Sequence, residues 1–284
     1  MAERLNGIIG ALEQGKPAFT TFAQPDVNEV VGLATSNYDG VVFELEHNPW
    51  DIKALRDGLQ YMLNRAQIAK SGSIAPAVTP MVRVPANGGE MNQTYAKQAL
   101  DLGAYGIIWP HISDEAQAYN AVAACRYPRL ASAPLYEPQG IRGDGPTAAA
   151  RYWGLGQQDY YRHADVWPLS PEGDIFCILM IEDTLGIKNL DSILKNVPGI
   201  GAILIGEGDL SQELGVPRQY DHPLLLEHMA QVVATCKANN VPVGHPHVDG
   251  NNVERVLDEG YRFLMAAPSR SYGALEKGRQ LAGR

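Results

Sequence analysis

The strongest constraint on the fold is an alternation of short apolar segments with helix-like segments along the chain. Each apolar segment has the length and composition of a buried strand, and each is separated from the next by a segment that predicts a helix. The eight predicted strands are residues 18–22, 41–46, 77–84, 105–110, 175–181, 201–205, 241–245 and 261–266. Strands that alternate with helices form parallel sheets, and eight such units in 284 residues predict a closed (β/α)₈ barrel, of the TIM barrel type, rather than an open sheet.

We expect one barrel domain over residues 1–284. Helices are predicted over about 3–14, 25–34, 51–68, 90–102, 113 onward, 186–196, 222–239, 250–258 and 269–282. Residues 128–173 are rich in Pro, Gly and aromatic residues and are predicted to be an irregular insert.

Composition narrows the class of protein. The chain has 23 basic and 32 acidic residues and a formal net charge of −9, which argues against nucleic acid as a partner. It contains no apolar run of membrane-spanning length, and Met1–Asn6 lacks the apolar core of a signal peptide. Three isolated cysteines without a CxxC pair fit core packing in a reducing cytoplasm. No GxGxxG or P-loop motif follows any strand.

Charged residues lie at the carboxyl-terminal ends of four predicted strands. Glu44, Glu46 and His47 lie within the stretch Val41–Trp50, Arg83 lies near the end of the next strand, and Glu182 and Asp209 follow two later ones. Charged side chains cannot stay buried without partners. The carboxyl ends of barrel strands carry the active site. The sequence therefore predicts one shared site.

Glu182 and Asp209 end neighbouring strands, and two carboxylates at a barrel mouth are a common way to hold Mg²⁺ or Mn²⁺. The alternative is that the two acids cap helices or pair with lysine.

Arg83 lies in an apolar strand and needs an anion. It is interpreted either as a fork for a carboxylate or enolate oxygen or as a salt bridge to Glu44 or Glu46. His47 is a candidate general base, although six other histidines compete with it.

Two further segments lie at strand ends. Gly206-Glu207-Gly208-Asp209 could offer backbone amides to an anion, or could be a simple turn. His245-Pro-His247 has two imidazoles, but the spacing without a third ligand makes it a weak metal motif.

Taken together, these segments resemble the HpcH/HpaI aldolase family of metal-dependent class II pyruvate aldolases, from about residue 4 to 272. The matching segments are Glu44-Leu-Glu-His47 for D-G-E-H, Val82-Arg-Val-Pro85 for V-R-V-P, Gly103–Pro110 for G-A-x-G-x-x-x-P, Ala123–Pro128 with Gly140–Gly143 for A-x-R-Y-P…G-x-R-G, Ile181-Glu182 for I-E, and Gly206–Ser211 for G-x-x-D-L-S. Each segment alone is weak, and their order and spacing carry the resemblance.

The resemblance implies a role for each matched residue. Glu182 and Asp209 would hold a divalent metal, Mg²⁺ or Mn²⁺ with Co²⁺ as a further candidate. Arg83 would hold the enolate oxygen, and His47 would be the acid/base. Asp101 matches an aspartate that the family lends to the histidine of a neighbouring subunit.

The resemblance also implies a substrate and an assembly. Amides of Gly206–Asp209, which include Glu207 and Gly208, would take the substrate carboxylate. The protein would be a homo-hexamer, a trimer of dimers that exchange C-terminal helices. No nucleic acid or membrane partner is expected.

The sequence departs from the family pattern at three places. Met180 stands where the family often has glutamine. Glu44 replaces a shorter aspartate and is a candidate to reach metal-bound water. Residues 144–174 carry extra aromatic residues, which could line the acceptor pocket, form an interface or be purely structural.

The predicted function is a class II aldehyde-lyase that cleaves 4-hydroxy-2-oxo acids to pyruvate, or hydroxypyruvate, and an aldehyde. The alternatives are a related metal–enolate lyase, such as a CoA-thioester lyase or an oxaloacetate decarboxylase, and a non-catalytic barrel that binds a metal or a carboxylate.

Overall fold

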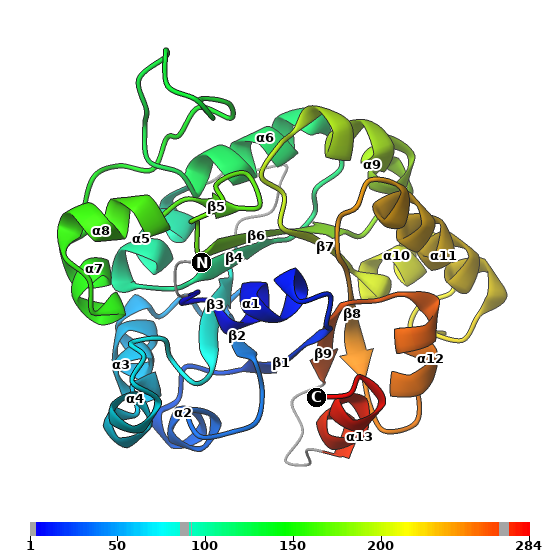
Figure 1. Ribbon diagram of the computed structural model, residues 1–284. Coiled ribbons are helices and arrows are strands. Elements are labelled where there is room, and N and C mark those ends of the chain that lie inside the picture. Colours follow the sequence, from blue (N-terminus) through cyan, green and yellow to red (C-terminus); the bar gives the residue numbers. More distant parts are fainter. Residues whose placement is uncertain (1–3, 86–90, 92, 267–272) are drawn as a thin grey trace.

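Eight parallel strands close into a barrel in the computed structural model, which describes residues 4–85, 91, 93–266 and 273–284 (Figure 1). The strands are β1 (Ala18–Ala23), β2 (Gly40–Glu44), β3 (Thr79–Arg83), β4 (Gly106–Trp109), β6 (Ile175–Ile181), β7 (Ala202–Ile205), β8 (Val243–Val248) and β9 (Phe263–Ala266). Their order is β4-β3-β2-β1-β9-β8-β7-β6, and pairing of β4 with β6 closes the ring. The predicted fold class, a (β/α)₈ barrel, is confirmed.

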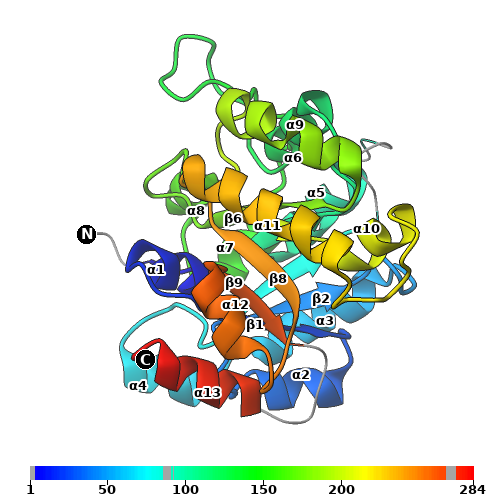
Figure 2. The same ribbon diagram turned by 90° about the vertical axis from the view of Figure 1, so that its right-hand side faces the viewer.

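The helices lie around the strands, most of them on the outside of the barrel (Figures 1 and 2). They are α1 (Gly7–Glu13), α2 (Val27–Leu33), α3 (Ile52–Met62), α4 (Arg65–Ser71), α5 (Gln93–Leu102), α6 (Glu115–Ala124), α7 (Thr147–Trp153), α8 (Gln157–His163), α9 (Thr184–Asn196), α10 (Glu207–Glu213), α11 (Pro223–Ala238), α12 (Val253–Glu259) and α13 (Gly273–Leu281). The short strand β5 (Val166–Trp167) pairs with β6 outside the ring.

The first helix closes the amino-terminal end of the barrel. Ile8 and Ile9 of α1 are fully buried in the same apolar cluster as the inward-facing strand residues. Gly40 makes room for this helix, because a Cβ there would overlap the Ile8 side chain. The opposite, carboxyl-terminal end is therefore the one left for a site.

Strand periodicity decides which side chains face that end. Val42, Met81 and Ile178 belong to the inner cluster of the barrel. Side chains two residues further along a strand point to the same face. Glu44 and Arg83 therefore lie on the inner face of their strands, directly above the apolar interior.

Three predictions about elements need correction. The helix predicted over 51–68 is two helices, α3 and α4, because Asn64 breaks it and caps the second by accepting the Gln67 N–H at 3.0 Å. The stretch 128–173 is irregular only in its first part, which stands out from the body in Figure 1, and it then forms α7, α8 and β5. The strand predicted over 241–245 continues to Val248, so His247 lies on β8. Residue 3 of the first predicted helix, residues 90 and 92 of another and residues 269–272 of the last lie outside the described part of the chain.

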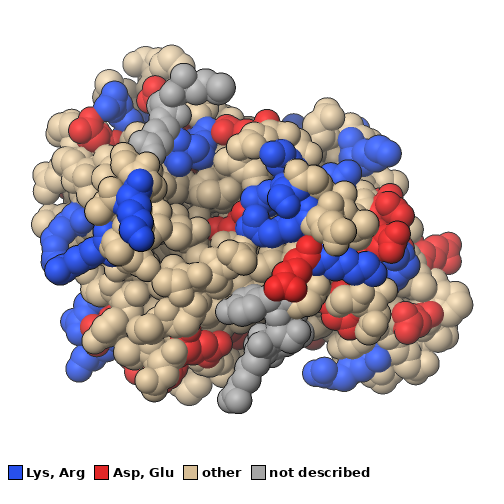
Figure 3. Space-filling view, turned by 60° about the horizontal axis from the view of Figure 1, so that its bottom comes forward, with Lys and Arg blue, Asp and Glu red and all other residues tan. Residues whose placement is uncertain are grey.

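The last helix packs against its own barrel. A Cβ on Gly278 would overlap the Phe19 ring, and Arg279 and Arg284 both pair with Asp39. Exchange of this helix between subunits stays a prediction. Figure 3 shows acidic and basic side chains interspersed over one face of the molecule, which therefore carries no uniform charge.

Two expectations from composition can be compared with the described residues. Cys125, Cys177 and Cys236 are free and buried, which confirms their predicted role in core packing. Within the described ranges, no helix combines the length and the apolar character needed to cross a bilayer.

Candidate active site

A cavity of about 270 Å³ lies at the carboxyl-terminal end of the barrel strands. Its lining includes four predicted parts of the site: His47, Arg83, Glu182 and the segment Gly206–Asp209. The other lining residues are Phe22, Met180, Gln212, Arg218, Tyr220, Pro246 and His247. Residues far apart in the sequence therefore meet at one end of the barrel, as their positions after the strands predict.

Glu44 shapes the turn that follows β2. One carboxylate oxygen accepts the backbone N–H groups of Glu46 at 2.9 Å and His47 at 3.1 Å. The other oxygen accepts from Nε of Arg83. Both oxygens are thus committed to holding the turn and the arginine, and Glu44 does not line the cavity. Its catalytic role stays a prediction.

Arg83 is held between two carboxylates. It pairs with Glu44, and its Nη1 lies 2.9 Å from Oε2 of Glu46. Its guanidinium also lines the cavity, lies 3.7 Å from the Met180 sulfur and stands over the Phe22 ring. The predicted salt bridges of Arg83 to Glu44 and Glu46 are therefore present. The same contacts hold the guanidinium group in a fixed orientation at the cavity wall.

Glu46 links the turn to a second histidine. Its carboxylate lies 3.5 Å from Nε2 of His47 and 3.5 Å from Nε2 of His111. Burial opposes ionisation of Glu46, but the hydrogen bond from His111 and the charge of Arg83 outweigh it, so its pKa lies below the ordinary value. Glu46 therefore stands as the anion that joins Arg83 to both histidines.

The two predicted metal ligands meet a third group. Ligand atoms of His111, Glu182 and Asp209 all lie within 4.8 Å of one another. Glu182 is buried, and one of its oxygens accepts the backbone N–H of His111 at 2.8 Å. His111 has a positive φ of 56°, a strained conformation of the kind that clusters at functional sites.

Electrostatics of this cluster favour a cation. Burial raises the pKa of Glu182 to about 7, and the neighbouring charges of Glu46 and Asp209 add to the rise while His111 opposes it. The hydrogen bond to Glu46 raises the pKa of His111 to about 9, although burial opposes this. A carboxylate this crowded by acids is stabilised by a positive charge, so the residues fit a divalent ion. Sequence reasoning does not find His111 in this role, although its position two residues after a strand is a usable signal.

Gly206 makes room for Glu182. A Cβ at position 206 would lie 2.5 Å from Cδ of Glu182 and would overlap its other atoms. Gly206 is the N-cap of α10 and makes no side-chain capping bond. The predicted turn at Gly206–Asp209 is therefore the beginning of a helix, whose first backbone amides border the cavity.

Glu207 points toward β8 and is not part of the cluster of His111, Glu182 and Asp209. Its carboxylate is 3% exposed, contacts Nδ1 of His247 and lies 3.8 Å from Nε2 of His245. The two histidines thus pair with a carboxylate and do not join the cluster of His111, Glu182 and Asp209.

Arg218 and Tyr220 complete the outer wall of the cavity. Arg218 has φ of 55°, and its backbone N–H donates to Oγ of Ser211 at 2.9 Å. Sequence reasoning gives no signal for these residues, because they lie in the loop between α10 and α11.

Asp101 lies at the other end of the barrel in its own chain. It is next to last in α5, which leads into the start of β4, and it accepts from Nη2 of Arg142 at 3.0 Å. Burial raises its pKa even though Arg142 opposes the shift. Asp101 and His47 are not brought together within one chain, so a role in the site requires a second subunit.

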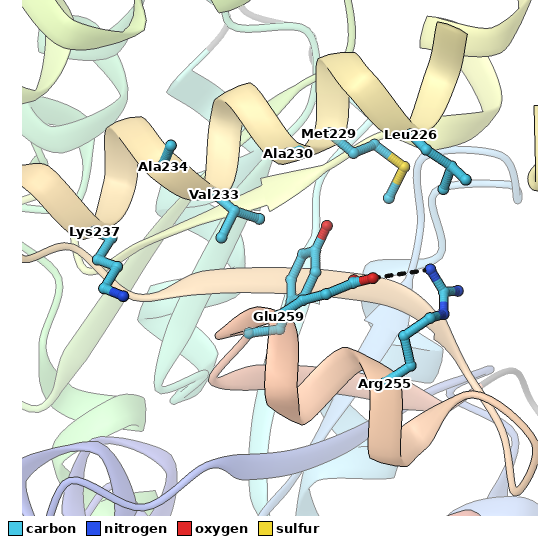
Figure 4. Close-up of a pocket in the computed structure, with 9 residues that line it drawn as sticks. Leu226, Met229, Ala230, Val233, Ala234, Lys237, Arg255 and Glu259 are labelled. Atoms are coloured by element: carbon cyan, nitrogen blue, oxygen red, sulfur yellow. Dashed lines mark hydrogen bonds and ion pairs between the residues drawn. The ribbon is translucent and has the colours of Figure 1, made fainter. Parts of the chain in front are cut away.

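A second cavity, of about 340 Å³, lies between α11 and α12 (Figure 4). Leu226, Met229 and Val233 of α11 line this cavity, Tyr261 is a further lining residue, and Arg255 and Glu259 of α12 form an ion pair at its edge. It is apolar and lacks the strand-end residues, so the cavity at the barrel mouth is the candidate active site.

Comparison with known proteins agrees with this geometry. Residues 19–269 match the family model of the HpcH/HpaI aldolase/citrate lyase proteins. The chain belongs to this family. It is 31% identical over 246 residues to a 5-keto-4-deoxy-D-glucarate aldolase of Escherichia fergusonii, covering 87% of this chain and 82% of that protein. It is also 31% identical over 273 residues to a hydroxypyruvate/pyruvate aldolase of Roseobacter denitrificans, covering 94% and 92%.

A solved structure shares the fold of this family member. An HpcH/HpaI aldolase/citrate lyase family protein from Burkholderia cenocepacia superposes with a TM-score of 0.76 at 26% identity, covering 97% of each chain. The family and its named relatives indicate an aldolase or lyase, and the predicted resemblance is confirmed.

Proposed function

We propose that this protein is a divalent-metal-dependent aldolase that cleaves 4-hydroxy-2-oxo acids to pyruvate, or hydroxypyruvate, and an aldehyde. The observation that carries the proposal is that Glu182 and Asp209 line one cavity with Arg83 and that ligand atoms of His111 lie within 4.8 Å of theirs. Relatives at 31% identity whose names denote aldolases of a keto-deoxy sugar acid and of hydroxypyruvate or pyruvate support the same class of substrate.

Glu182 and Asp209, with His111 as a third ligand, would hold Mg²⁺ or Mn²⁺, and Co²⁺ also suits this ligand set. When bound, the ion would supply Lewis-acid polarisation of the 2-oxo group. A ligating imidazole must be neutral, so binding through His111 would release a proton.

The protein's own residues account for the remaining steps. The backbone amides at Gly206–Asp209 bind the substrate carboxylate. His47, through a water molecule, takes the proton of the 4-hydroxyl group. The C3–C4 bond then breaks, the aldehyde departs, and the electron pair moves to form the enolate of pyruvate. Arg83 faces the developing negative charge on the enolate oxygen, and preorganised stabilisation of this kind is usually the largest catalytic term.

The proposal includes an oligomer and a cytoplasmic location. Asp101 and His47 lie at opposite ends of one barrel and do not meet within one chain. Asp101 would therefore reach His47 of a neighbouring subunit, within a hexamer of three dimers. His47 is 65% exposed, which leaves it accessible to such a partner. Three free, buried cysteines suit a reducing compartment.

The decisive experiment is exchange of the pyruvate methyl protons in D₂O, followed by proton NMR with Mg²⁺ and after exhaustive chelation. We expect exchange that requires the ion. Glu182→Gln should keep the fold and abolish exchange, because it removes one of two protein charges on the ion. A matched control is Glu213→Gln, which changes a carboxylate that pairs with Thr184 outside the cavity. Full activity after chelation would refute the metal mechanism, and no exchange under any condition would favour a non-catalytic barrel.

A further inference from the structure

Two histidines of β8 surround one buried carboxylate in the wall of the cavity. Glu207 accepts from Nδ1 of His247, while Nε2 of His245 lies 3.8 Å from its second oxygen. These three residues take no part in the mechanism above, apart from the backbone amide of Glu207. A buried carboxylate needs partners, and both partners here are imidazoles.

The hydrogen bonds define which nitrogen carries each proton. The backbone N–H of His247 donates to Nδ1 of His245 at 3.2 Å, so the proton of His245 lies on Nε2, facing Glu207. Burial lowers the pKa of His245 to about 4, which keeps this imidazole neutral. A carboxylate only accepts, so Nδ1 of His247 carries the proton in its bond to Glu207. The Nε2 atom of His247 is then the nitrogen that can take up and release a proton.

His247 is placed to use that nitrogen in the cavity. Its side chain is 48% exposed and lines the same cavity as Arg83 and Glu182, while His245 is almost fully buried behind it. The Tyr220 ring lies 5.5 Å from it at 34° and covers one face. In the ring of strands, His47 follows β2 and His247 lies on β8. The residues of the proposed metal site, His111, Glu182 and Asp209, follow β4, β6 and β7, so the two histidines lie on different sides of that site.

A reaction through pyruvate enolate needs two proton transfers at different atoms. One removes the 4-hydroxyl proton, and the other adds a proton to C3 of the enolate before pyruvate leaves. A carboxylate that fixes the tautomer of an imidazole is the usual arrangement for a histidine that moves protons. A merely structural pair would have no need to expose the imidazole to the cavity.

Resting on the proposed function, we propose that His247 is a second acid/base of this site, positioned by Glu207, and that it moves the proton at C3. In the forward direction Nε2–H gives its proton to C3, and the C2–C3 double-bond electrons form the new C–H bond as the 2-oxo group returns. In reverse, neutral Nε2 takes a methyl proton of pyruvate, and the C–H electrons form the enolate, whose oxygen faces Arg83.

The test compares two rates in the metal-loaded protein. The first is exchange of the pyruvate methyl protons in D₂O with Mg²⁺. The second is the rate at which aldehyde forms in a single turnover of a 4-hydroxy-2-oxo acid, with enzyme in excess, which reports C3–C4 cleavage. His247→Gln keeps a donor for Glu207 but has no titratable nitrogen, and His247→Ala leaves space for added imidazole. The matched control is His163→Gln, because Nδ1 of His163 pairs with the buried Asp174 at 2.7 Å outside the cavity.

We expect the rate of proton exchange to fall by about 10²-fold or more in both His247 variants. The single-turnover rate of aldehyde formation should fall by a factor at least about tenfold smaller. Added imidazole should restore part of the exchange in His247→Ala and none in His247→Gln. Glu207→Gln should lower kcat for exchange more than it changes KM for pyruvate, as expected for a positioning residue, and Glu207→Asp should recover part of the loss. The control should keep the wild-type ratio of the two rates.

Exchange at the wild-type rate in His247→Gln would overturn the assignment, and so would an equal loss of both rates without imidazole rescue. A wild-type protein with no Mg²⁺-dependent exchange would instead refute the proposed function, and this inference with it.

Discussion

Replacement of Gly206 by alanine should displace Glu182 and weaken divalent-metal binding. The added Cβ would lie 2.5 Å from Cδ of Glu182, whereas carbon atoms in contact lie about 3.5–4.0 Å apart. The carboxylate must therefore move by about 1 Å, and its 2.8 Å bond to the His111 N–H must lengthen or break. The backbone itself is not the obstacle, since φ at Gly206 is −92°.

Two magnitudes follow for Gly206→Ala. Overpacking of a tight site costs about 1–3 kcal/mol in the free energy of unfolding. Metal ligands tolerate shifts of only about 0.2 Å, and misplacing a ligand's support usually costs about 10–100-fold in metal affinity. We therefore expect a Kd for Mn²⁺ at least 10-fold higher than in the wild type, with a folded protein.

Gly208→Ala is the matched control. It lies two residues away in α10, and a Cβ there would meet no heavy atom within 4 Å. Alanine in a helix should stabilise the protein by about 0.5–1 kcal/mol, so the two variants should change stability in opposite directions. The assays are titration calorimetry with Mn²⁺ and urea unfolding of the chelated protein. Wild-type Mn²⁺ affinity in Gly206→Ala would refute the placement of Glu182 at the metal.

Four further outcomes can be checked. Arg83→Lys should fail to restore the activity lost in Arg83→Ala, because lysine lacks the planar fork; near-normal turnover would mean that the salt bridge alone is required. His47→Ala should lower kcat/KM for aldol cleavage by roughly 10²–10⁴-fold and that for oxaloacetate decarboxylation much less, since the departing carboxylate is already ionised; equal losses would remove His47 as the base. Burial lowers the pKa of His245 to about 4 in the folded protein, so the unfolded chain binds this proton more readily. The free energy of unfolding should therefore fall by about 3 kcal/mol as the pH drops from about 6.5 to 4. His245→Asn should lose this part of the fall, and an unchanged pH dependence of unfolding between these pH values in the variant would contradict it. If Asp101 completes the site of a neighbouring subunit, activity should disappear when the protein is monomeric. Light scattering that showed an active monomer would exclude Asp101 from the site.

The sequence by itself determined the barrel and the positions of its polar ends. Period-2 alternation places Glu44 and Arg83 on the same inner face as Val42 and Met81, which can be read from spacing alone. Because parallel strands all end at one side of a barrel, His47, Arg83, Glu182 and Asp209 were expected at one mouth, and all four line one cavity.

Local breaks were harder to predict than the strands. The apolar pattern over 51–68 runs through Asn64, but the Asn64 side chain caps a new helix there. The aromatic residues after 144 form helices because Trp153 stacks on Tyr105 at 4.0 Å and its Nε1 donates to the Gly103 carbonyl at 2.8 Å. Such partners lie about 50 residues away along the chain, so local propensity does not contain them.

Pairing between strand ends was decided only by the tertiary structure. His111 meets Glu182 at 71 residues of separation, and Glu207 meets His247 at 40. Each of these residues in isolation has several equally good roles, because charge and hydrogen-bonding capacity do not specify a partner. Closure of the barrel brings particular strands side by side, and this closure places Glu182 beside His111 and Asp209 and turns Glu207 toward the histidines.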